Sequence, residues 1–363
     1  MKYYVIAGEA SGDLHASKLV KALKEQDPEA QFKGWGGDLM QNNGVEIVKH
    51  YKDLAFMGFV EVLANLKTIF GNIRFCKKDI LNFKPDALIL IDYPGFNLRI
   101  AKFAHKAGIK VFYYIAPQVW AWHQSRVKAM RRDIDKLFVI LPFEKDFFQN
   151  HGLDAEFVGH PLLDTIQHPE KSIKKQGKPI VALLPGSRKQ EIEKTLPIFL
   201  NATLNFPDYQ FIVAGVKTQS NEFYHQYMKD YPDVKLIFSS TYSILNQAYA
   251  ALVTSGTATL ETALHKVPQI VCYKGNSISY FLAQRFIKVK YVSLVNLIVD
   301  RLLVKELIQK DLNECNLKQE LNVLLKDEVY RSTIDEGYNE LIQKLGKSGA
   351  SETTARLILK ELH

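Results

Sequence analysis

The sequence predicts an α/β protein made of two lobes, each built on a parallel β-sheet with helices on both faces. Short apolar strands alternate with helix-length segments through both halves of the chain. Each half opens with a strand that runs into a turn of small residues, at residues 3–13 and again at 180–188. A length of 363 residues is enough for two domains with separate cores. Apolar strands separated by helices are typical of sheets that are buried on both faces.

The predicted strands are the short apolar runs, taken in chain order. They cover residues 3–7, 31–35, 87–92, 110–115, 136–140 and 155–157 in the first half, and 180–184, 211–214, 234–238, 250–253 and 269–272 in the second. A helix is predicted at 190–205. The polar segment Gln167–Lys178 contains Pro169, Gly177 and several lysines, which is typical of a linker. We therefore expect domains at residues 1–166 and 179–345.

The last segment, residues 350–363, is predicted to form a helix, with Ser351 placed to cap its first turn. This helix either packs back on the first domain or exchanges with a partner chain. The second arrangement would make the protein a homodimer.

Composition restricts the class of protein. Hydrophobic residues make up 47% and charged residues 24%, as in an ordered soluble domain. Three cysteines form no disulfide framework, which favours a reducing, cytoplasmic setting. The opening MKYYVIAGEA lacks the layout of a signal peptide, and no apolar run approaches the ~20 residues that span a bilayer. A net charge of +8 indicates an anionic partner, of which nucleic acid is the least favoured because no nucleic-acid-binding module is recognisable.

In the first half, polar residues follow the ends of two predicted strands. The segment GEASGD at 8–13 places Glu9 at a strand end, with Ser11 or Asp13 available to cap the next helix. Asp92 follows the strand at 87–91 and precedes a Pro-Gly turn. Asp92 is therefore either a general base at a ligand crevice or an aspartate that forms the turn.

An aromatic segment, residues 113–123, follows the next strand. Gln118 and His123 can hydrogen-bond a substrate, and Trp120 can stack on a sugar or line an acyl chain. The alternative is a packed loop with a structural histidine.

The second half carries two turns suited to a phosphate. Gly186, Ser187 and Arg188 join a strand to a helix, and arginine is suited to bidentate phosphate recognition. A second strand-to-helix junction contains Ser255, Gly256 and Thr257. Such junctions form anion nests from backbone N–H groups. Two further residues each have two possible roles. Glu261 accepts hydrogen bonds from ribose hydroxyls, or places a negative charge near the positive end of the helix. Asn296 binds the substrate, or forms a turn.

Residues 59–73 repeat apolar side chains at helical spacing, with Lys67 and Arg74 along one edge. The helix either faces the core or presents an apolar patch to an acidic membrane surface. The patch would consist of Phe56, Met57, Val60, Leu63, Leu66 and Phe70.

Metal and hydrolase motifs are missing from the sequence. There is no HExxH, no Cys/His cluster and no GxSxG, and the spacing GxxxxGK[ST] does not occur. We expect no metal and no cofactor.

Several motifs, in this order, resemble the lipid-A-disaccharide synthase family, and together they cover nearly the whole chain. They are GEASGD, AFMGFVEVL, APQVWAW, LPFEKDFF, FVGHP, LLPGSR, SGTATLE and YVSLVNLI. The resemblance implies a GT-B fold, in which two Rossmann-like domains face each other across a cleft. It also implies transfer of the sugar of UDP-2,3-diacylglucosamine to the 6-hydroxyl of 2,3-diacylglucosamine 1-phosphate, with inversion and without metal, by an enzyme peripheral to the inner membrane.

The resemblance assigns roles to matching positions. Asp92 would be the general base, while Arg188 and Asn296 would stabilise the departing UDP diphosphate. Ser255, Gly256, Thr257 and Glu261 match the nucleotide nest; Glu9 and Asp13 match the first motif, as acceptor ligands or as helix architecture. Two positions depart from the family pattern: Val295 stands where a proline is expected, and Gly95 where an acidic residue is expected.

Two alternatives compete with this interpretation. Another GT-B enzyme acting on UDP-N-acetylglucosamine, such as a 2-epimerase or a peptidoglycan glycosyltransferase, would share the nucleotide turns but not the pair GEASGD and APQVWAW. A non-catalytic nucleotide-sugar or lipid-binding protein would have no need of Asp92 together with Arg188.

Overall fold

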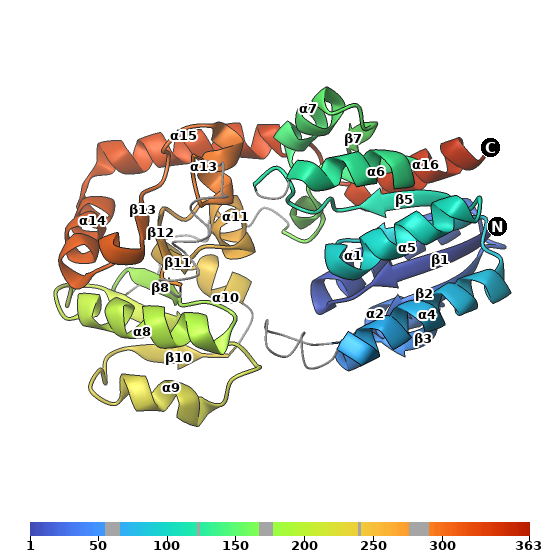
Figure 1. The fold of residues 1–363 in the computed structure, drawn as a ribbon. Helices are drawn as coiled ribbons and strands as arrows, with labels where there is room; N and C mark the ends of the chain where they lie inside the picture. Colours follow the sequence, from blue (N-terminus) through green and yellow to red (C-terminus); the bar gives the residue numbers. More distant parts are fainter. Residues whose placement is uncertain (55–65, 122–123, 167–176, 239–240, 276–289) are drawn as a thin grey trace. The chain divides into compact units, whose positions relative to one another are not determined.

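The computed structural model describes residues 1–54, 66–121, 124–166, 177–238, 241–275 and 290–363. The chain divides into two compact units (Figure 1). Unit 1 contains Met1–Asp164 together with Leu345–His363, and unit 2 contains Thr165–Lys344. Each unit is an α/β domain with a parallel sheet, as the sequence predicts. The expected linker, Gln167–Lys178, lies almost wholly outside the described residues.

Unit 1 has a seven-stranded sheet in the order β3-β2-β1-β4-β5-β6-β7, with neighbouring strands parallel. The strand at the centre, β4, is buried along its whole length. The strands are β1 (Lys2–Ala7), β2 (Gln31–Gly36), β3 (Glu46–His50), β4 (Ala87–Ile91), β5 (Lys110–Tyr114), β6 (Lys136–Val139) and β7 (Ala155–Phe157).

Helices cover both faces of this sheet, because successive strand residues point to opposite sides. One face packs on α4 (Leu66–Phe83), α5 (Pro94–Lys106), α6 (Val127–Asp133) and α7 (Pro142–Asn150). The other face packs on α1 (Ala10–Gln26), α2 (Asp38–Asn42) and α16 (Ala350–Leu362).

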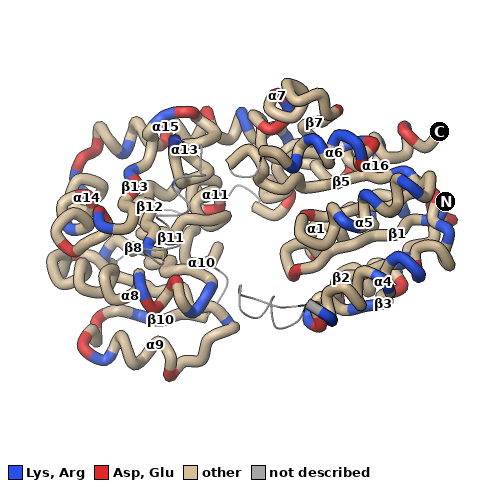
Figure 2. Tube along the Cα trace, in the orientation of Figure 1, with Lys and Arg blue, Asp and Glu red and all other residues tan. Residues whose placement is uncertain are grey.

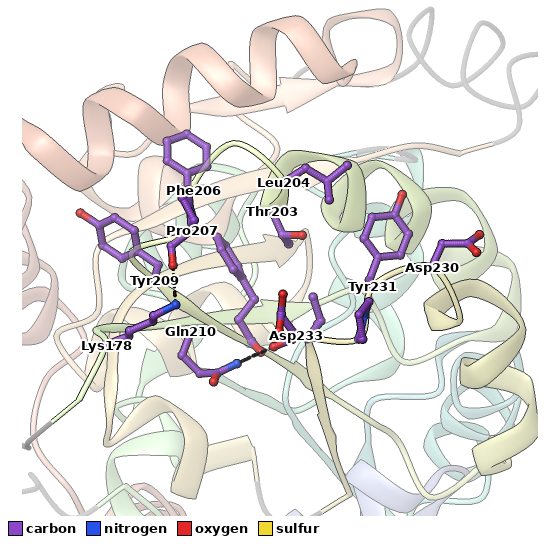
Figure 3. A pocket seen from close by; sticks show the side chains of 13 residues that line it. Lys178, Thr203, Leu204, Phe206, Pro207, Tyr209, Gln210, Asp230, Tyr231 and Asp233 are labelled. Atoms are coloured by element: carbon purple, nitrogen blue, oxygen red, sulfur yellow. Dashed lines mark hydrogen bonds between the residues drawn. The ribbon is translucent and has the colours of Figure 1, made fainter.

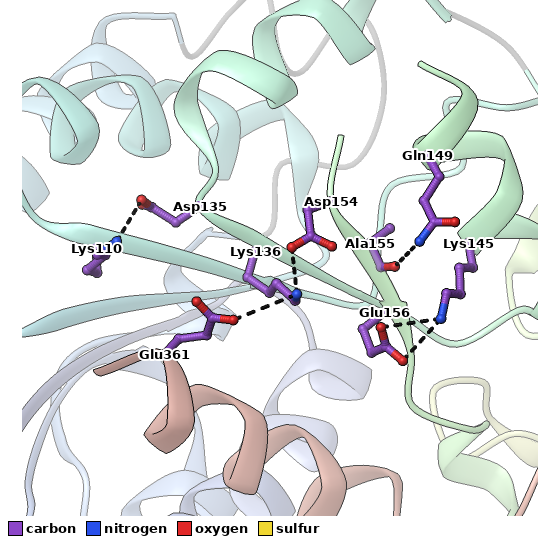
Figure 4. A network of polar contacts seen from close by, with 9 residues as sticks. All are labelled: Lys110, Asp135, Lys136, Lys145, Gln149, Asp154, Ala155, Glu156 and Glu361. Atoms are coloured by element: carbon purple, nitrogen blue, oxygen red, sulfur yellow. Dashed lines mark hydrogen bonds and ion pairs between the residues drawn. The ribbon is translucent and has the colours of Figure 1, made fainter. Parts of the chain in front are cut away.

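The terminal helix α16 packs on its own chain, against α1 and the sheet of unit 1. Ile358 is fully buried there. Lys136 at the start of β6 also reaches Asp154 and, at 3.7 Å, Glu361 of α16 (Figure 4). The helix begins at Ala350, with Gly349 as its N-cap, so the prediction that Ser351 caps it is wrong. Ser351 lies inside the first turn, where its backbone is already helical.

Unit 2 has a six-stranded parallel sheet in the order β10-β9-β8-β11-β12-β13. Its strands are β8 (Ile180–Leu184), β9 (Gln210–Ala214), β10 (Lys235–Ile237), β11 (Ala248–Thr254), β12 (Gln269–Tyr273) and β13 (Glu306–Ile308). Its helices are α8 (Lys189–Thr203), α9 (Asn221–Met228), α10 (Thr241–Leu245), α11 (Thr257–Leu264), α13 (Leu294–Val299), α14 (Glu314–Lys326) and α15 (Glu328–Lys344).

Two edge strands, β3 and β13, are missing from the sequence prediction. Both carry charged and half-buried residues rather than a continuous apolar run. In β3 and β13 the charged residues interrupt the apolar run by which the other strands were found, including the edge strands β7 and β10.

Candidate active site

A pocket of about 450 Å³ opens at the carboxyl ends of β8, β9 and β11 in unit 2. The two predicted phosphate turns meet there because β8 and β11 are neighbours in the sheet. The lining includes Gly186, Ser187, Arg188, Glu191, Ser255, Gly256, Thr257 and Glu261. The structure thus gathers two turns that are far apart in the sequence into one site.

The two helices at this pocket begin differently. The amino terminus of α8 is capped by its own Glu191, whose carboxylate accepts the N–H groups of Ser187 at 3.0 Å and Arg188 at 3.2 Å. The Arg188 side chain is 74% exposed and lies 3.8 Å from the same carboxylate. The expected anion nest at this turn is therefore filled by the chain itself, and the arginine is what the turn offers to a ligand.

The amino terminus of α11 has no side-chain cap at its N-cap residue, Gly256. The first N–H groups of a helix have no acceptor within the helix, so they remain suited to an anion. The neighbouring Ser255 hydroxyl donates to the carbonyl of Val292 at 3.3 Å, which ties this turn to the segment before α13.

Glu261 lies one turn into α11 and lines the same pocket. Burial raises the pKa of this carboxyl, and the Tyr242 hydroxyl, which donates to it at 2.9 Å, opposes the rise. A carboxylate held in this way can accept hydrogen bonds from sugar hydroxyls.

Asn296 is fully buried and does not line this pocket. Its amide nitrogen donates to the carbonyl of Val304 and to Glu306, both at 2.8 Å, while its oxygen accepts the N–H groups of Leu303 and Val304 at 2.9 Å. This differs from the expected contact with a diphosphate, because all four hydrogen-bonding positions of the side chain are used. Asn296 therefore fixes the backbone at Leu303 and Val304 and bonds to Glu306.

Glu306 organises the same segment and was not found from the sequence. Its carboxylate accepts the N–H groups of Val292 and Ser293, both at 2.9 Å. Val295, which stands where proline was expected, donates its N–H to the Ser293 hydroxyl at 3.1 Å. Proline has no N–H, so this chain gains a helix cap at that position rather than a looser backbone.

In unit 1, Glu9 and Asp92 lie on neighbouring strand ends, because Ala7 of β1 pairs with Ile91 of β4. Asp92 and Tyr93 both have left-handed backbone angles, φ +44° and +48°. The Asp92 carbonyl accepts the Tyr113 hydroxyl and, at 2.8 Å, the Asn97 side-chain amide. These bonds hold a turn that costs energy for residues other than glycine, and such turns cluster at functional sites.

The Asp92 carboxyl is half-buried, and its pKa is raised from 3.8 to about 6. Burial is the main cause, the negative charge of Glu9 adds to it, and the N–H of Tyr93 opposes it. A carboxylate with a pKa near the working pH is suited to accept a proton in a reaction.

Asp13 is 2% exposed and has an architectural role. Its carboxylate accepts the N–H groups of Gly37 at 2.7 Å, Leu39 at 3.1 Å and Met40 at 3.1 Å, and so caps α2. The expected capping of α1 by Ser11 or Asp13 is wrong, because α1 starts at Ala10 with Glu9 as its N-cap. Glu9 and Ser11 are exposed.

Trp120 is buried, with its indole N–H donating to Glu144 at 2.9 Å and its ring edge-on to Phe143. The indole is therefore an anchor of the loop rather than a surface for stacking a sugar. Burial raises the pKa of Glu144 to about 7, against the N–H of Leu141 and the indole N–H. Gln118 is exposed in the same loop, and His123 lies outside the described residues.

Of the predicted membrane patch, Phe56, Met57, Val60 and Leu63 lie outside the described residues, and Leu66 begins α4. Phe70 is 61% exposed, whereas Ile73 faces the core. Phe70, Arg74 and Leu81 follow at helical spacing on the exposed side of α4, where Figure 2 shows basic residues. In the part of the chain that the structure describes, no helix is long and apolar enough to cross a membrane.

A second pocket, of about 320 Å³, lies at the amino ends of β8, β9 and β10 (Figure 3). Two of its polar side chains bond within the fold: Lys178 donates to the carbonyl of Pro207 at 2.7 Å, and Gln210 to that of Asp233 at 2.8 Å. Within the described residues, no group of three or more His, Cys, Asp or Glu side chains is placed to hold a metal ion.

These features define a GT-B fold, with two α/β units that each carry a parallel sheet. Solved structures share this fold. They include the glycotransferase of kitacinnamycin (TM-score 0.67, 13% identity, 100% of this chain and 99% of that one) and a UDP co-structure of S. aureus MnaA (0.65, 15%, 98% and 94%). A UDP-N-acetylglucosamine 2-epimerase of Neisseria meningitidis bound to its UDP-sugar is also similar (0.61, 12%, 100% and 99%). At these identities the likeness shows the fold alone.

The family is shown by sequence. The model of the family "Lipid-A-disaccharide synthetase" matches residues 3–360. The lipid-A-disaccharide synthase of Syntrophus aciditrophicus is 40% identical over 368 residues, covering 98% of this chain and 96% of its own, and that of Nitrosococcus oceani is 38% identical over 374 residues, covering 99% and 95%. The chain belongs to the lipid-A-disaccharide synthase family and is a hexosyltransferase of lipid A biosynthesis. The epimerase and binding-protein alternatives are not favoured.

Proposed function

We propose that this enzyme transfers the sugar of UDP-2,3-diacylglucosamine to the 6-hydroxyl of 2,3-diacylglucosamine 1-phosphate. The products are the β-1,6-linked lipid A disaccharide 1-phosphate and UDP. The observation that carries the proposal is the family match over residues 3–360. The half-buried Asp92 and the open α11 terminus supply the groups that this reaction needs.

In the proposed reaction, the Asp92 carboxylate takes the proton of the acceptor 6-hydroxyl as that oxygen attacks the anomeric carbon. The bond from the anomeric carbon to the diphosphate breaks on the opposite face, so the configuration inverts and the electron pair leaves with UDP. The N–H groups at the start of α11 and the Arg188 guanidinium stabilise the charge on UDP. Because these groups supply the positive charge, we propose that the reaction needs no metal ion.

Other residues bind or position. Glu261 accepts hydrogen bonds from the ribose hydroxyls, with Tyr242 fixing its carboxylate. Asn296 and Glu306 hold the segment to which Ser255 is bonded. In unit 1, Glu9 faces the acceptor and raises the pKa of Asp92. Gln118 is exposed in the aromatic loop after β5, and we propose that it binds the acceptor.

The test is to incubate the purified protein with both lipid substrates in detergent and determine the product by mass spectrometry and NMR. A β-1,6 disaccharide that forms equally well with a metal chelator present supports the proposal. Conversion of UDP-N-acetylglucosamine to its 2-epimer, without disaccharide, would contradict it.

We propose further that the enzyme works in the cytoplasm, bound peripherally to the inner membrane through the exposed side of α4. Phe70 and Leu81 are more than half exposed there. Arg74 lies between them along the helix and Lys67 lies one turn before Phe70, where both can contact anionic headgroups. Phe70→Ser should weaken sedimentation with vesicles of anionic lipid, whereas Leu302→Ser, which changes an exposed leucine of unit 2, should not. Equal sedimentation of both variants would contradict the assignment.

The sequence analysis left two arrangements of the terminal helix open, and exchange with a partner chain would give a homodimer. In this structure α16 buries its apolar face on its own unit 1, and so the helix has its packing surface within one chain. We propose that the monomer holds a full set of catalytic residues; light scattering during turnover measurements tests this, and activity confined to a dimeric fraction would contradict it.

A further inference from the structure

We infer that Glu191 is a positioning residue that holds the Gly186–Arg188 turn so that the Arg188 side chain reaches the diphosphate from this side of the pocket. The inference rests on the proposed function, because it takes a nucleoside diphosphate as the ligand of the unit 2 pocket. It adds a residue that neither the motif nor the family match assigns.

Glu191 contacts two backbone N–H groups of the turn and the arginine side chain. One carboxylate oxygen accepts the N–H groups of Ser187 and Arg188, at 3.0 and 3.2 Å, and the other lies 3.8 Å from the Arg188 guanidinium. A phosphate oxygen competes poorly for these N–H groups, because both already donate to the carboxylate and the carboxylate repels a second anion. The turn therefore acts through the arginine.

The turn is built around this carboxylate. Gly186 has φ +122°, and an added Cβ there would lie 2.6 Å from the Glu191 Cβ and 2.8 Å from its carboxylate oxygen. The Thr195 hydroxyl fixes the start of the turn by donating to the carbonyl of Pro185 at 2.6 Å. Glycine at 186 is thus needed both for the backbone angle and for the approach of Glu191.

The other helix of the pocket is left open, which is where the diphosphate is placed. No side chain caps the start of α11 at Gly256. Thr254, at the end of β11, lines the same pocket, is 6% exposed, and its hydroxyl has no hydrogen-bond partner among the described residues. A buried hydroxyl without a partner is costly, and a ligand oxygen at the α11 terminus would satisfy it. The start of α11 therefore binds the diphosphate, and Glu191 orients Arg188 toward it.

The experiment is a double-mutant cycle read by calorimetric titration with UDP, which needs no turnover. Loss of a charge-assisted contact predicts that Arg188→Ala weakens UDP binding about tenfold or more. Glu191→Ala should weaken binding about threefold to tenfold when Arg188 is present, and cause no further loss when Arg188 is already alanine. Glu191→Gln, whose amide oxygen still accepts both N–H groups, should bind UDP within about twofold of the wild type.

The matched control is Glu193→Ala on the same helix. Glu193 pairs with Lys189 and does not line the pocket, so its loss should leave UDP binding unchanged. If Glu191→Ala lowers the melting temperature so far that it cannot be titrated, Glu191→Asp, whose carboxylate is one methylene shorter, takes its place in the cycle.

The possible outcomes distinguish a failure of the Glu191 inference from a failure of the proposed function. Equal losses from Glu191→Ala with and without Arg188 would show a general structural role and overturn the inference alone. Tighter UDP binding by Glu191→Ala would also overturn it, since Glu191 would then compete with the diphosphate for the turn. A folded wild-type protein that does not bind UDP would overturn the proposed function and the inference together.

Discussion

Replacing Glu9 by glutamine should shift the pH dependence of the enzyme to lower pH. Glu9 and Asp92 follow neighbouring strands, and the negative charge of Glu9 disfavours ionisation of Asp92. The substitution would remove this charge and keep the shape of the side chain. The pKa of Asp92 would fall, and the carboxylate would persist at lower pH.

The magnitude follows from the pKa of Asp92, which is raised from 3.8 to about 6. A base with a pKa of about 6 is about 90% ionised at pH 7 and about 10% ionised at pH 5, so kcat/KM should fall about tenfold between them. Burial causes most of the rise and remains in the variant. Loss of the Glu9 charge should therefore lower the pKa without returning it to 3.8, which raises the activity at pH 5 relative to that at pH 7 by a factor of less than about ten.

The assay is release of UDP in detergent across pH 4.5–8, expressed relative to the value at pH 7 so that any change in acceptor binding cancels. Glu25→Gln is the matched control, because it removes the same charge from the exposed far end of α1. An acidic limb that stays in place in Glu9→Gln, or moves to higher pH, would refute the electrostatic link between Glu9 and Asp92.

Three further predictions concern stability and binding. Gly34→Ala should destabilise unit 1 by about 3 kcal/mol or more in urea melts, because the added Cβ would lie 1.8 Å from the carbonyl oxygen of Val5; Gly95→Ala, which meets nothing within 4 Å, is the control, and equal melts would contradict the packing. Ile358→Ala should lower the free energy of unfolding by about 2–5 kcal/mol and Lys136→Ala by less than about 1 kcal/mol, because apolar burial rather than the ion pairs of Figure 4 holds α16. A larger loss for Lys136→Ala would show that the ion pairs hold the helix. Tyr242→Phe removes the bond that favours ionised Glu261, so the pKa of Glu261 should rise and UDP affinity should fall more steeply on acidification than in the wild type; parallel pH curves would count against a role for the Glu261 carboxylate.

The sequence was sufficient to predict two parallel sheets, most of their strands and two turns suited to a phosphate. Buried parallel strands are apolar throughout, and polar residues at their carboxyl ends must share one edge of the sheet. The turns at Arg188 and Ser255 share one pocket because β8 and β11 are neighbours, which the structure shows. The strands β3 and β13 were missed because charged residues interrupt their apolar pattern.

Partner choice was not predictable in the same way. Asn296 looked like a ligand because it is polar within an apolar stretch, yet its partners are the backbone of Leu303 and Val304 and the carboxylate of Glu306. Residue spacing does not predict these contacts, because they depend on where β13 joins the sheet. Glu144 and Glu191, by contrast, lie at the third position of their helices, where a capping glutamate is common, so that signal was present in the sequence.

The most direct test of the central claim is the kcat of Asp92→Asn for disaccharide formation, measured together with its affinity for UDP. Asparagine tolerates the left-handed backbone at this position and lacks only the basic oxygen. If Asp92 is the base, kcat should fall about 10²–10⁴-fold while the affinity for UDP stays unchanged. A variant that forms the disaccharide at a rate close to that of the wild type would show that Asp92 is not the base.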